Sequence, residues 1–495
     1  MSTPAARPSA EAADDPRPRR RRRSRRLGLI VLAAHVLGIL TSIHALMTVR
    51  TSQGTIAWIV SLNTFPYGAV PAYWVFGRSK FQGYVIERRT RDQWTDQEAR
   101  RVAAALDPLI PDFARSPGAA LAGQRLARLP YLGGNEVELL IDGEATFESI
   151  FDGIDRARDY VLVQFYIVHD DRVGGELADH LIAKAREGVR VRFLYDEIGS
   201  GDLGDAYRES LEAAEVSVAP FGTTRGRGNR FQLNFRNHRK IVVVDGVEGW
   251  VGGHNVGDEY LGRDPEVGAW RDTHLRIAGP AAIGLQLAFL EDWNWATGEL
   301  LFDQLSWKVE PRGESAALIL PSGPADRLET ASLMFQQAIQ GARERVWIAS
   351  PYFVPDDGVL SALHLAALRG VDVRLLVPER SDSRIVDAAA ETFLQALIDS
   401  GIAVYRYQGG FLHSKHFLVD DLVSSVGTAN LDNRSLRLNF EVTAIVGDPA
   451  LNAKMVEMFE RDLARSRRVT TEELAARSFG RRLFARAALM FSPVL

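Results

Sequence analysis

Cysteine is absent from all 495 residues. Its absence excludes disulfide bonds, a thiolate nucleophile and cysteine-ligated zinc. The chain also has no HExxH pair and no carboxylate-rich cluster, the patterns typical of other metal sites. A large excess of one charge is missing too, because 59 basic and 63 acidic residues give a net charge of −4. These absences exclude a cysteine-held metal and give no sign of another kind of metal site.

The basic residues are unevenly placed along the chain. Residues 1–26 hold nine arginines and three acids, which leaves 50 basic and 60 acidic residues to the rest. A basic tail before an acidic body argues against a body that coats nucleic acid through bulk charge. The tail is rich in Pro, Ala and Arg and has no apolar periodicity, which predicts disorder.

Two apolar runs follow the tail. Residues 27–49 carry no formal charge over 23 residues, and as a helix they extend about 34 Å, enough to cross a bilayer core. Residues 55–77 form a second run, interrupted by Asn63, Pro66 and Pro71 but edged by Trp and Tyr as interfacial segments are. The alternative for each run is a buried helix of a soluble core. We predict a transmembrane helical hairpin over residues 27–80.

The charges beside these runs predict their orientation. Residues 19–26 and the bases of residues 78–89 outnumber Arg50, which stands alone between the runs. By the positive-inside rule, both ends of the hairpin then lie in the cytoplasm.

From about residue 130 onward, the chain alternates between strand and helix patterns. The apolar runs 160–171 and 189–197 flank an amphipathic helical stretch, and 345–357 and 371–379 repeat the arrangement. Strand, acidic pair, helix, glycine and strand form a βαβ unit, which predicts an α/β fold with helices on both faces of a parallel or mixed sheet.

A second repetition is sharper. The stretch HRKIVVVDGVEGWVGGHN (238–255) aligns without a gap with HSKHFLVDDLVSSVGTAN (413–430), at a constant distance of 175 residues. A single short motif has a high false-positive risk, whereas two copies in register do not arise by chance. The matched pairs are His238 with His413, Lys240 with Lys415, Asp245 with Asp420, Gly252 with Gly427, and Asn255 with Asn430.

The spacing of the motif predicts how its side chains are arranged. Residues i and i+2 of a strand share a face, so His238 and Lys240 point the same way, as do His413 and Lys415. The turn at Asp245 and Gly246 lets the chain return antiparallel. Packing the two repeats face to face then brings two imidazoles, two ammonium groups and the amides of Asn255 and Asn430 together.

Such a set suits a phosphodiester. Lysine ammonium groups bind the non-bridging oxygens, and the asparagines donate to charge that develops in the transition state. One imidazole can attack phosphorus while the other protonates the leaving alkoxide, through a phosphohistidine intermediate. Two ammonium groups beside the histidines would repel a divalent cation, so a metal is not expected here.

An attacking imidazole needs an acceptor at its other nitrogen. Asp272 and Glu441 each open a strand after the motif, 34 residues after His238 and 28 after His413, and we predict that each orients the histidine of its own repeat. The alternative is a solvated acid at a strand end. As members of the motif, Asp245 and Asp420 are counted with His238, Lys240, His413 and Lys415 among the candidate catalytic residues. By parity, however, both acids face away from the histidines and are expected to hold the turn.

These residues resemble the phospholipase D superfamily, whose hallmark is a duplicated HxKx4D followed by a Gly-rich turn and Asn. The match covers about residues 131–450. More narrowly, the chain is similar to bacterial cardiolipin synthases of the phospholipase D type. The stretches that carry this narrower resemblance are GNEVELLIDG, GGHNVGDEYLG, WRDTHLRIAGP, LPSGP, PYFVPDD, TANLDNRS and the terminal SPVL.

The resemblance implies a reaction between two phosphatidylglycerol molecules that gives cardiolipin and glycerol without nucleotide or metal. It implies that His238 takes the phosphatidyl group and that His413 acts first as acid and then as base. It also implies a multi-pass protein of the bacterial inner membrane with a cytoplasmic body and no nucleic-acid partner. The Arg-rich tail departs from the family pattern, and we expect it to bind anionic phospholipids.

Four alternatives remain open from the sequence. A hydrolase of the superfamily would use the same motifs with water as acceptor. A transferase could accept another headgroup, such as phosphatidylethanolamine. A nuclease would share the site but not the membrane spans. A membrane scaffold would have no use for both intact motifs.

The C-terminal residues 480–495 gather arginines near Leu483, Phe484, Met490 and Phe491. This pattern fits a helix in the membrane interface, and it fits equally a helix packed on the body. The predicted organisation is a disordered tail (1–26), a membrane hairpin (27–80), a linker with helical segments (81–130), and two pseudo-symmetric phospholipase D-like α/β/α repeats (131–305 and 306–495).

Overall fold

A computed structural model describes residues 17–77, 81, 84, 102–222, 234–265 and 267–492, and of these it describes no side chain for 17–25 and 27. The chain divides into two compact units, Met1–Ser79 and Lys80–Leu495. The described part of the first unit is helical, with α1 (Arg17–Thr48), α2 (Ser52–Thr64) and α3 (Pro66–Phe76).

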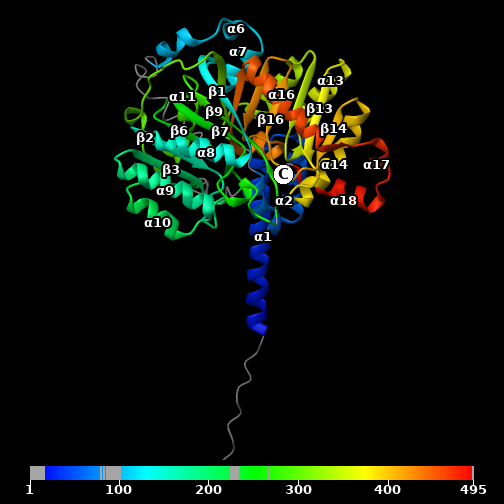
Figure 1. The fold of residues 1–495 in the computed structure, drawn as a ribbon. Coiled ribbons are helices and arrows are strands. Elements are labelled where there is room, and N and C mark those ends of the chain that lie inside the picture. The colour runs from blue at the N-terminus through cyan, green and yellow to red at the C-terminus, as the bar shows by residue number, and fades with distance from the viewer. Residues whose placement is uncertain are drawn as a thin grey trace, which may run out of the picture. The chain divides into compact units, whose positions relative to one another are not determined.

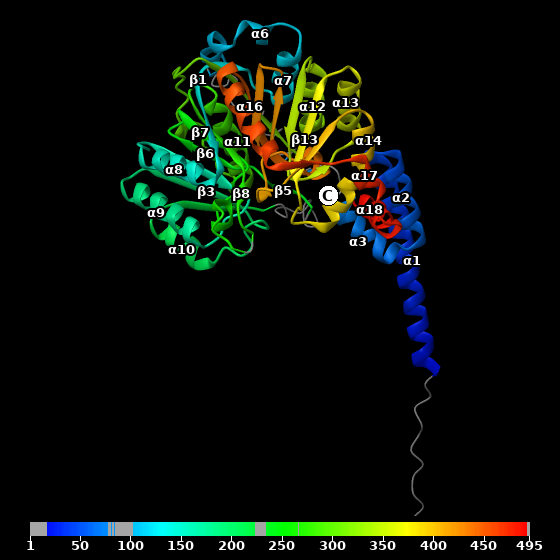
Figure 2. The same ribbon diagram turned by 45° about the vertical axis from the view of Figure 1, so that its right-hand side comes forward.

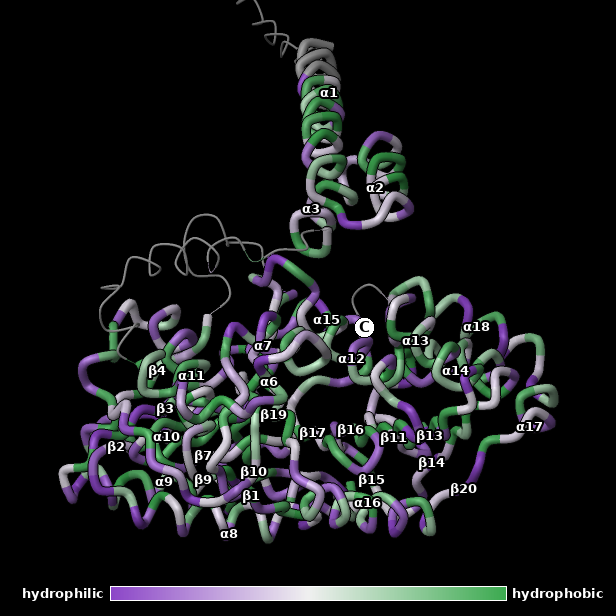
Figure 3. Tube along the Cα trace, turned by 90° about the horizontal axis from the view of Figure 1, so that it is seen from above, coloured by the Kyte–Doolittle hydropathy of each residue, from purple (hydrophilic) through white to green (hydrophobic). Residues whose placement is uncertain are grey.

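Helix α1 contains the first apolar run. Gly28–Thr48 is, by length and composition, the one helix among the described residues that could cross a membrane, and its tube is mostly green in Figure 3. The helix begins at Arg17, so the predicted disorder of residues 17–26 is wrong, while residues 1–16 lie outside the described part. Arginine is a good helix former, and a helix already nucleated in the apolar run extends into it readily.

The second apolar run is not a single helix. It breaks between α2 and α3 at Phe65, whose φ of −137° and ψ of 62° lie outside the helical region. The ring of Pro66 disfavours helical geometry at the residue before it. Both pieces contact α1, because Asn63 Nδ2 donates to Ser42 Oγ at 2.9 Å and Tyr73 OH lies 2.7 Å from His44 Nδ1.

Within its described residues the second unit is built on a 16-stranded sheet, in which 15 strands lie in one continuous order and the short β5 (Arg236–Asn237) pairs at its side. We call residues 131–305 the first half and 306–495 the second half. The first half supplies β1 (Leu132–Ile141), β2 (Tyr160–Phe165), β3 (Arg190–Asp196), β4 (Ser217–Phe221), β6 (Ile241–Val244), β7 (Glu248–Gly252) and β9 (Thr273–Ala278). The second half supplies β10 (Ser315–Ser322), β11 (Arg345–Ala349), β13 (Asp372–Pro378), β14 (Ala403–Tyr407), β16 (His416–Val419), β17 (Val423–Gly427), β19 (Asn439–Gly447) and β20 (Ser466–Arg468).

The strand order is similar on the two sides of the β10 and β1 pair. Outward from β1 it runs β9, β7, β6, β2, β3, β4, and outward from β10 it runs β19, β17, β16, β11, β13, β14 and finally β20. The strands β2, β3 and β4 pair in parallel, as do β11, β13 and β14, whereas the strands between these two groups and the edge strand β20 pair antiparallel. The sheet is therefore mixed, as predicted. The motif strands β6 and β16 therefore occupy matching places.

Helices cover both faces of the sheet (Figure 1). In the first half, α8 (Asp142–Asp155), α9 (Arg172–Arg186) and α10 (Asp205–Ala213) pack on one face and α11 (Ala282–Thr297) on the other. In the second half, α12 (Thr330–Gly341), α13 (Asp357–Leu368) and α14 (Arg384–Asp399) pack on one face and α16 (Pro449–Ala464) on the other. Alternate strand residues face each layer, as the period of two in a strand requires.

The remaining elements are short. Before β1 lie η1 (Asp107–Leu109), α6 (Asp112–Arg115) and α7 (Ala119–Ala127). Small strands and turns border the motifs: β5 (Arg236–Asn237), η2 (Asp258–Leu261), β8 (Trp270–Arg271), η3 (Phe302–Gln304), β12 (Phe353–Val354), β15 (Phe411–Leu412), β18 (Leu431–Asp432) and α15 (Asn433–Arg437). The chain ends with α17 (Thr471–Ala475) and α18 (Phe479–Leu489).

Phe81 and Tyr84 belong to the core of the second unit rather than to a bare linker. Phe81 is fully buried, and its ring lies 5.0 Å from that of Trp295. Tyr84 OH donates to Asp292 Oδ1 at 3.0 Å. All other residues between 82 and 101 lie outside the described part, so the predicted linker is described chiefly from residue 102 onward.

Asp245 and Asp420 hold the turns that follow the motif strands. Both adopt left-handed backbone geometry, with φ of 51° and 49°, a conformation that Asp tolerates better than most residues. The Asp245 carboxylate accepts three backbone N–H groups, from Arg158, Asp159 and Tyr160, at 2.8–2.9 Å. Asp420 binds the backbone of residues 343–345 in the same way. These acids tie each hairpin to the strand beside it.

Candidate active site

Each motif histidine directly follows a short strand that pairs with a strand of the opposite half. β5 pairs in parallel with β19, and the backbone N–H of His238 donates to the carbonyl of Phe440 at 2.9 Å. β15 pairs in parallel with β8, and the N–H of His413 donates to the carbonyl of Arg271 at 2.8 Å. Each histidine is therefore positioned by backbone from both halves.

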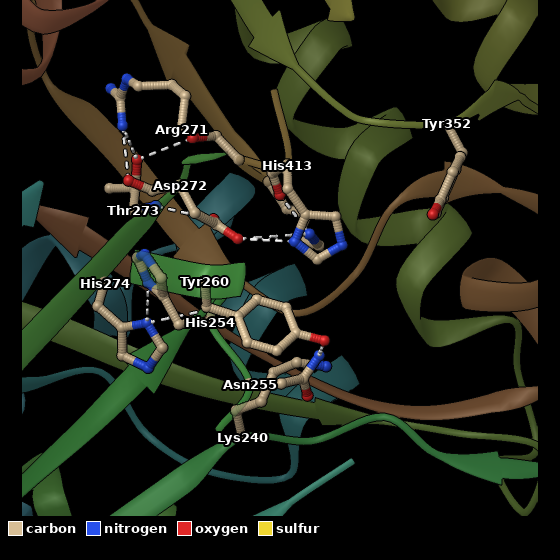
Figure 4. A network of polar contacts seen from close by, with 12 residues as sticks. Lys240, His254, Asn255, Tyr260, Arg271, Asp272, Thr273, His274, Tyr352 and His413 are labelled. Carbon is tan, nitrogen blue, oxygen red and sulfur yellow. Dashed lines mark hydrogen bonds and ion pairs between the residues drawn. The ribbon is translucent and has the colours of Figure 1, made fainter. Parts of the chain in front are cut away.

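The side chain of each motif histidine also contacts a residue of the opposite half. His238 Nδ1 lies 2.9 Å from Glu441 Oε2, and His413 Nδ1 lies 2.7 Å from Asp272 Oδ2; Figure 4 shows the second pair. Both acids thus contact a motif histidine, but the predicted pairing within one repeat is wrong. The sequence offset could not reveal this exchange, because it depends on the crossing of β5 and β15 into the other half.

Burial sets the protonation of these pairs. It lowers the pKa of His238 to about 4 and that of His413 to about 3, although the neighbouring carboxylates oppose the shift. Burial raises the pKa of Asp272, but Lys415 and the histidines around it bring the net value below the usual range. The pKa of Glu441 is lowered in the same way, with burial outweighed by His238 and Lys240. Each pair is therefore a neutral imidazole donating from Nδ1 to a carboxylate, which leaves Nε2 available.

Each motif lysine contacts the backbone of the motif histidine two residues before it. Lys240 Nζ donates to the carbonyl of His238 at 2.8 Å and sits over the ring of Tyr166, 5.4 Å from its centroid. Lys415 Nζ donates to the carbonyl of His413 and lies 3.9 Å from Asp272 Oδ2. Burial lowers the pKa of Lys415 to about 8 and that of Lys240 well below its ordinary value. A bound anion would raise the pKa of both groups.

The two asparagines hold the loops that follow the motif. Asn255 Oδ1 accepts the backbone N–H of Ile167 at 3.2 Å, and its Nδ2 donates to Tyr260 OH at 3.2 Å (Figure 4). The Asn430 amide acts on Asp432 by lowering the pKa of its carboxyl, while Asn430 Oδ1 has no hydrogen-bond partner among the described residues. Burial raises the pKa of Asp432 to about 6. Each amide retains donor capacity for a ligand.

Asp245 and Asp420 do not join this cluster. Their carboxylates bind backbone at the far ends of β6 and β16, as described above. Parity along the strand predicted this separation, so of the motif residues these two act on the fold rather than on the site.

Aromatic residues border the histidines, and sequence reasoning missed them. The ring of Tyr166 lies 5.0 Å from that of His238, and the ring of Trp270 lies 4.9 Å from that of His413. Tyr166 directly follows β2 but falls inside the predicted run 160–171, and Trp270 stands two residues before Asp272, so neither position carried a distinct signal in the sequence. Each motif histidine therefore has an aromatic ring packed beside its imidazole.

His254, His274 and His416 are buried around the site. His254 Nδ1 lies 3.1 Å from His274 Nδ1, on the side of Asp272 away from His413 (Figure 4). Neither ring nitrogen of His416 has a hydrogen-bond partner among the described residues. Burial lowers the pKa of His254 to about 4 and that of His416 to about 3. All three are packing residues of the interior.

Comparison with known proteins identifies the family of the chain. The model of the family described as "Cardiolipin synthase, PLD-like domain" matches residues 150–279 and 335–463. Cardiolipin synthase A of Pseudomonas entomophila is 47% identical over 475 residues, covering 94% of this chain and 98% of its own. Cardiolipin synthase A of Pseudomonas putida is 47% identical over 476 residues, covering 95% and 97%. Among solved structures, phosphatidylserine synthase of Haemophilus influenzae has a similar fold, with a TM-score of 0.59, 18% identity, and coverage of 76% of this chain and 100% of its own.

Proposed function

Since the chain belongs to the cardiolipin synthase family with a PLD-like domain, we propose how its residues perform the phosphatidyl transfer of a cardiolipin synthase. The chain is a phosphatidyltransferase of the phospholipase D superfamily. Its substrates are phospholipids, and we take phosphatidylglycerol as both donor and acceptor, with cardiolipin and glycerol as products.

One observation carries the proposal: two buried imidazoles are each held at Nδ1 by a carboxylate of the other half, beside two buried lysines. Fixing Nδ1 aims Nε2 at the reacting phosphorus. Lys240 and Lys415 would bind the non-bridging phosphate oxygens, and Asn255 and Asn430 would donate to them.

In the first step, Nε2 of His238 attacks the phosphorus of the donor. The N–P bond forms as the P–O bond to glycerol breaks, and His413 gives its proton to the departing oxygen. His413 must carry that proton when the donor binds. The positive charges of Lys415 and Lys240 add to burial in lowering the pKa of His413. The negative charge of the bound phosphodiester offsets these charges and so raises the pKa of His413, and proton uptake therefore accompanies donor binding.

In the second step, a hydroxyl of the second phosphatidylglycerol attacks the phosphohistidine. His413, now neutral, accepts the hydroxyl proton while the P–O bond forms and the N–P bond breaks. Neutral His238 is released and His413 is protonated for the next turnover, so protons and bonds balance over the cycle. Tyr166 and Trp270 shield the phosphohistidine from water, which favours transfer over hydrolysis.

The finer architecture is part of the same proposal. Residues 131–305 and 306–495 would be pseudo-symmetric repeats, supported by the similar strand order and the aligned motifs. Residues 27–80 would form a membrane hairpin in which α2 and α3 together return along α1, supported by the bond from Asn63 to Ser42. The arginines beside both ends would keep tail and body in the cytoplasm of a multi-pass inner-membrane protein.

The test is to incubate the purified protein with phosphatidylglycerol in mixed micelles, without metal or nucleotide, and identify the lipids by mass spectrometry. Cardiolipin with an equal amount of glycerol supports the proposal. Phosphatidic acid alone would mean that water is the acceptor. In the same assay, His364→Ala is the control for variants of His238 and His413. His364 lies on α13, and its side chain contacts Ser400 rather than a residue of the site.

A further inference from the structure

The C-terminal helix α18 exposes apolar side chains that its packing does not use. Ala485 and Ala488 are 5% and 3% exposed, whereas Leu483, Met490 and Phe491 are 59%, 80% and 57% exposed. A helix that only packs on the body would turn its large apolar residues inward. This helix does the reverse and buries its small ones.

The inward face of α18 is fixed to α14. Arg481 Nε donates to Glu391 Oε2 at 3.1 Å, and Arg477 pairs with the same carboxylate at 3.4 Å. Ala488 joins a buried cluster with Ala388 and Ala389 of α14. Figures 1 and 2 both show α18 beside α14. The helix is therefore held in one rotation about its axis.

That rotation gathers the large apolar residues on the outward face. Phe479 and Leu483 are four residues apart, and two pairs spaced by seven, Leu483 with Met490 and Phe484 with Phe491, continue the face. Arg482 and Arg486, both exposed, flank it. An apolar face bordered by arginines is the pattern of helices that lie in the interface of anionic membranes.

The helix also lies close to the candidate site. Ala488 packs with Val354 of β12, and Val354 is paired with Asp432 of β18. Asp432 stands two residues after Asn430 of the second motif, and the Asn430 amide lowers the pKa of the Asp432 carboxyl. Three successive contacts thus connect α18 to Asn430, one of the residues that would bind phosphate.

We propose that α18 is an interfacial helix: Phe479, Leu483, Phe484, Met490 and Phe491 insert among the headgroups and upper acyl chains of an anionic bilayer, and Arg482 and Arg486 bind lipid phosphates. Insertion of such helices is about 5–10 Å deep. The helix keeps this part of the site at the membrane surface, where lipid substrates need to leave the bilayer only partly. Its membrane contact is measured without turnover and does not depend on the roles of the histidines.

The absence of cysteine permits a direct test on the full chain. Leu483→Cys and Met490→Cys would each carry a polarity-sensitive fluorophore in protein reconstituted into vesicles of phosphatidylcholine and phosphatidylglycerol. Leu368→Cys is the matched control, because Leu368 on α13 is also an exposed leucine near a helix end. We expect doxyl groups in the upper acyl chains to quench the α18 labels about threefold more than the control, and aqueous iodide to quench them less.

Two results would overturn the proposal. In one, iodide reaches the α18 labels as readily as the control. In the other, neither quencher reaches them, which would mean that protein, such as a second copy of the chain, covers the face.

A second comparison tests the link to catalysis. Leu483→Glu with Phe484→Glu should lower activity at least fivefold on phosphatidylglycerol in vesicles, but change activity little on a short-chain, monomeric phosphatidylglycerol. Leu365→Glu with Leu368→Glu is the control, since both of these leucines are exposed on α13. Activity on the soluble substrate reports that the variant is folded. An unchanged rate on vesicles, or an equal loss on both substrates, would contradict the idea that α18 presents the site to lipid.

Discussion

Nδ1 of His238 lies 2.9 Å from Oε2 of Glu441, a residue 203 positions further along the chain. The reciprocal pair, His413 with Asp272, is formed at 2.7 Å across 141 positions. Because each half supplies the acid for the histidine of the other, neither half contains a complete site. The function proposed here therefore depends on the docking of the two halves.

The first prediction concerns these acids. Glu441→Gln and Asp272→Asn should each lower kcat by about 10²–10⁴-fold, because an amide can hold the imidazole in the wrong tautomer. Steady-state assays with phosphatidylglycerol would measure this. Glu457→Gln, an exposed acid of α16, is the control. Full activity in either site variant would show that its carboxylate does not orient a catalytic histidine.

The second prediction concerns the lysines. Lys240→Met and Lys415→Met should each lower kcat/KM by about 10²–10³-fold, since each removes a buried cation that would bind a phosphate oxygen. Arginine should not restore activity, because the two side chains are 0% and 3% exposed and a larger head does not fit. Lys184→Met, which removes a buried lysine on α9, is the control. A site variant with near-normal kcat/KM would exclude its lysine from phosphate binding.

The third prediction concerns acid stability. Burial lowers the pKa of His416 to about 3, so between that value and the unfolded value near 6.5 the unfolded chain binds the extra proton. The free energy of unfolding then rises with pH across this window and is lost as the pH falls through it. His416→Phe should flatten the dependence by up to about 1.4 kcal/mol per pH unit. Denaturant unfolding in detergent between about pH 4 and 7 would measure both slopes, and parallel curves would contradict the prediction.

The fourth prediction separates fold from chemistry. Asp245→Ala should lower the free energy of unfolding by about 1–3 kcal/mol, because three backbone N–H groups lose their acceptor. Activity per folded molecule should stay close to normal. Asp421→Ala, whose side chain is 76% exposed, should change stability by less than about 0.5 kcal/mol. Loss of turnover in a folded Asp245→Ala variant would show that Asp245 also takes part in catalysis.

The sequence predicted the parts of the site that depend on local spacing. The gap of two residues set the common face of His238 and Lys240, and the strand parity of Asp245 separated it from them. The pairing of His238 with Glu441 was beyond it, because that contact depends on the path of β5 into the other half. Tyr166 and Trp270 were missed for the same reason: a ring beside a strand end has no signature until tertiary packing shows what it covers.

For the membrane segments, too, the sequence predicted some features and not others. Length and apolar composition identified the run that becomes Gly28–Thr48. The start of α1 depends on helix propensity in the arginine run, and the break between α2 and α3 depends on the effect of Pro66 on Phe65. Apolar composition alone predicts neither the start nor the break. For α18, periodicity could not separate packing from exposure, because Ala485 and Leu483 belong to opposite faces of one helix.

The most direct test of the central claim is to trap the phosphatidyl group on the protein. A phosphatidyl p-nitrophenyl ester needs no acid for its leaving group, so the His413→Ala variant should release one equivalent of p-nitrophenol and stop. Peptide mass spectrometry under neutral conditions should then find the phosphatidyl group on His238, and His238→Ala should show no adduct. An adduct on His413 in the His238→Ala variant would reverse the two roles, and the absence of any adduct despite turnover would contradict the phosphohistidine mechanism.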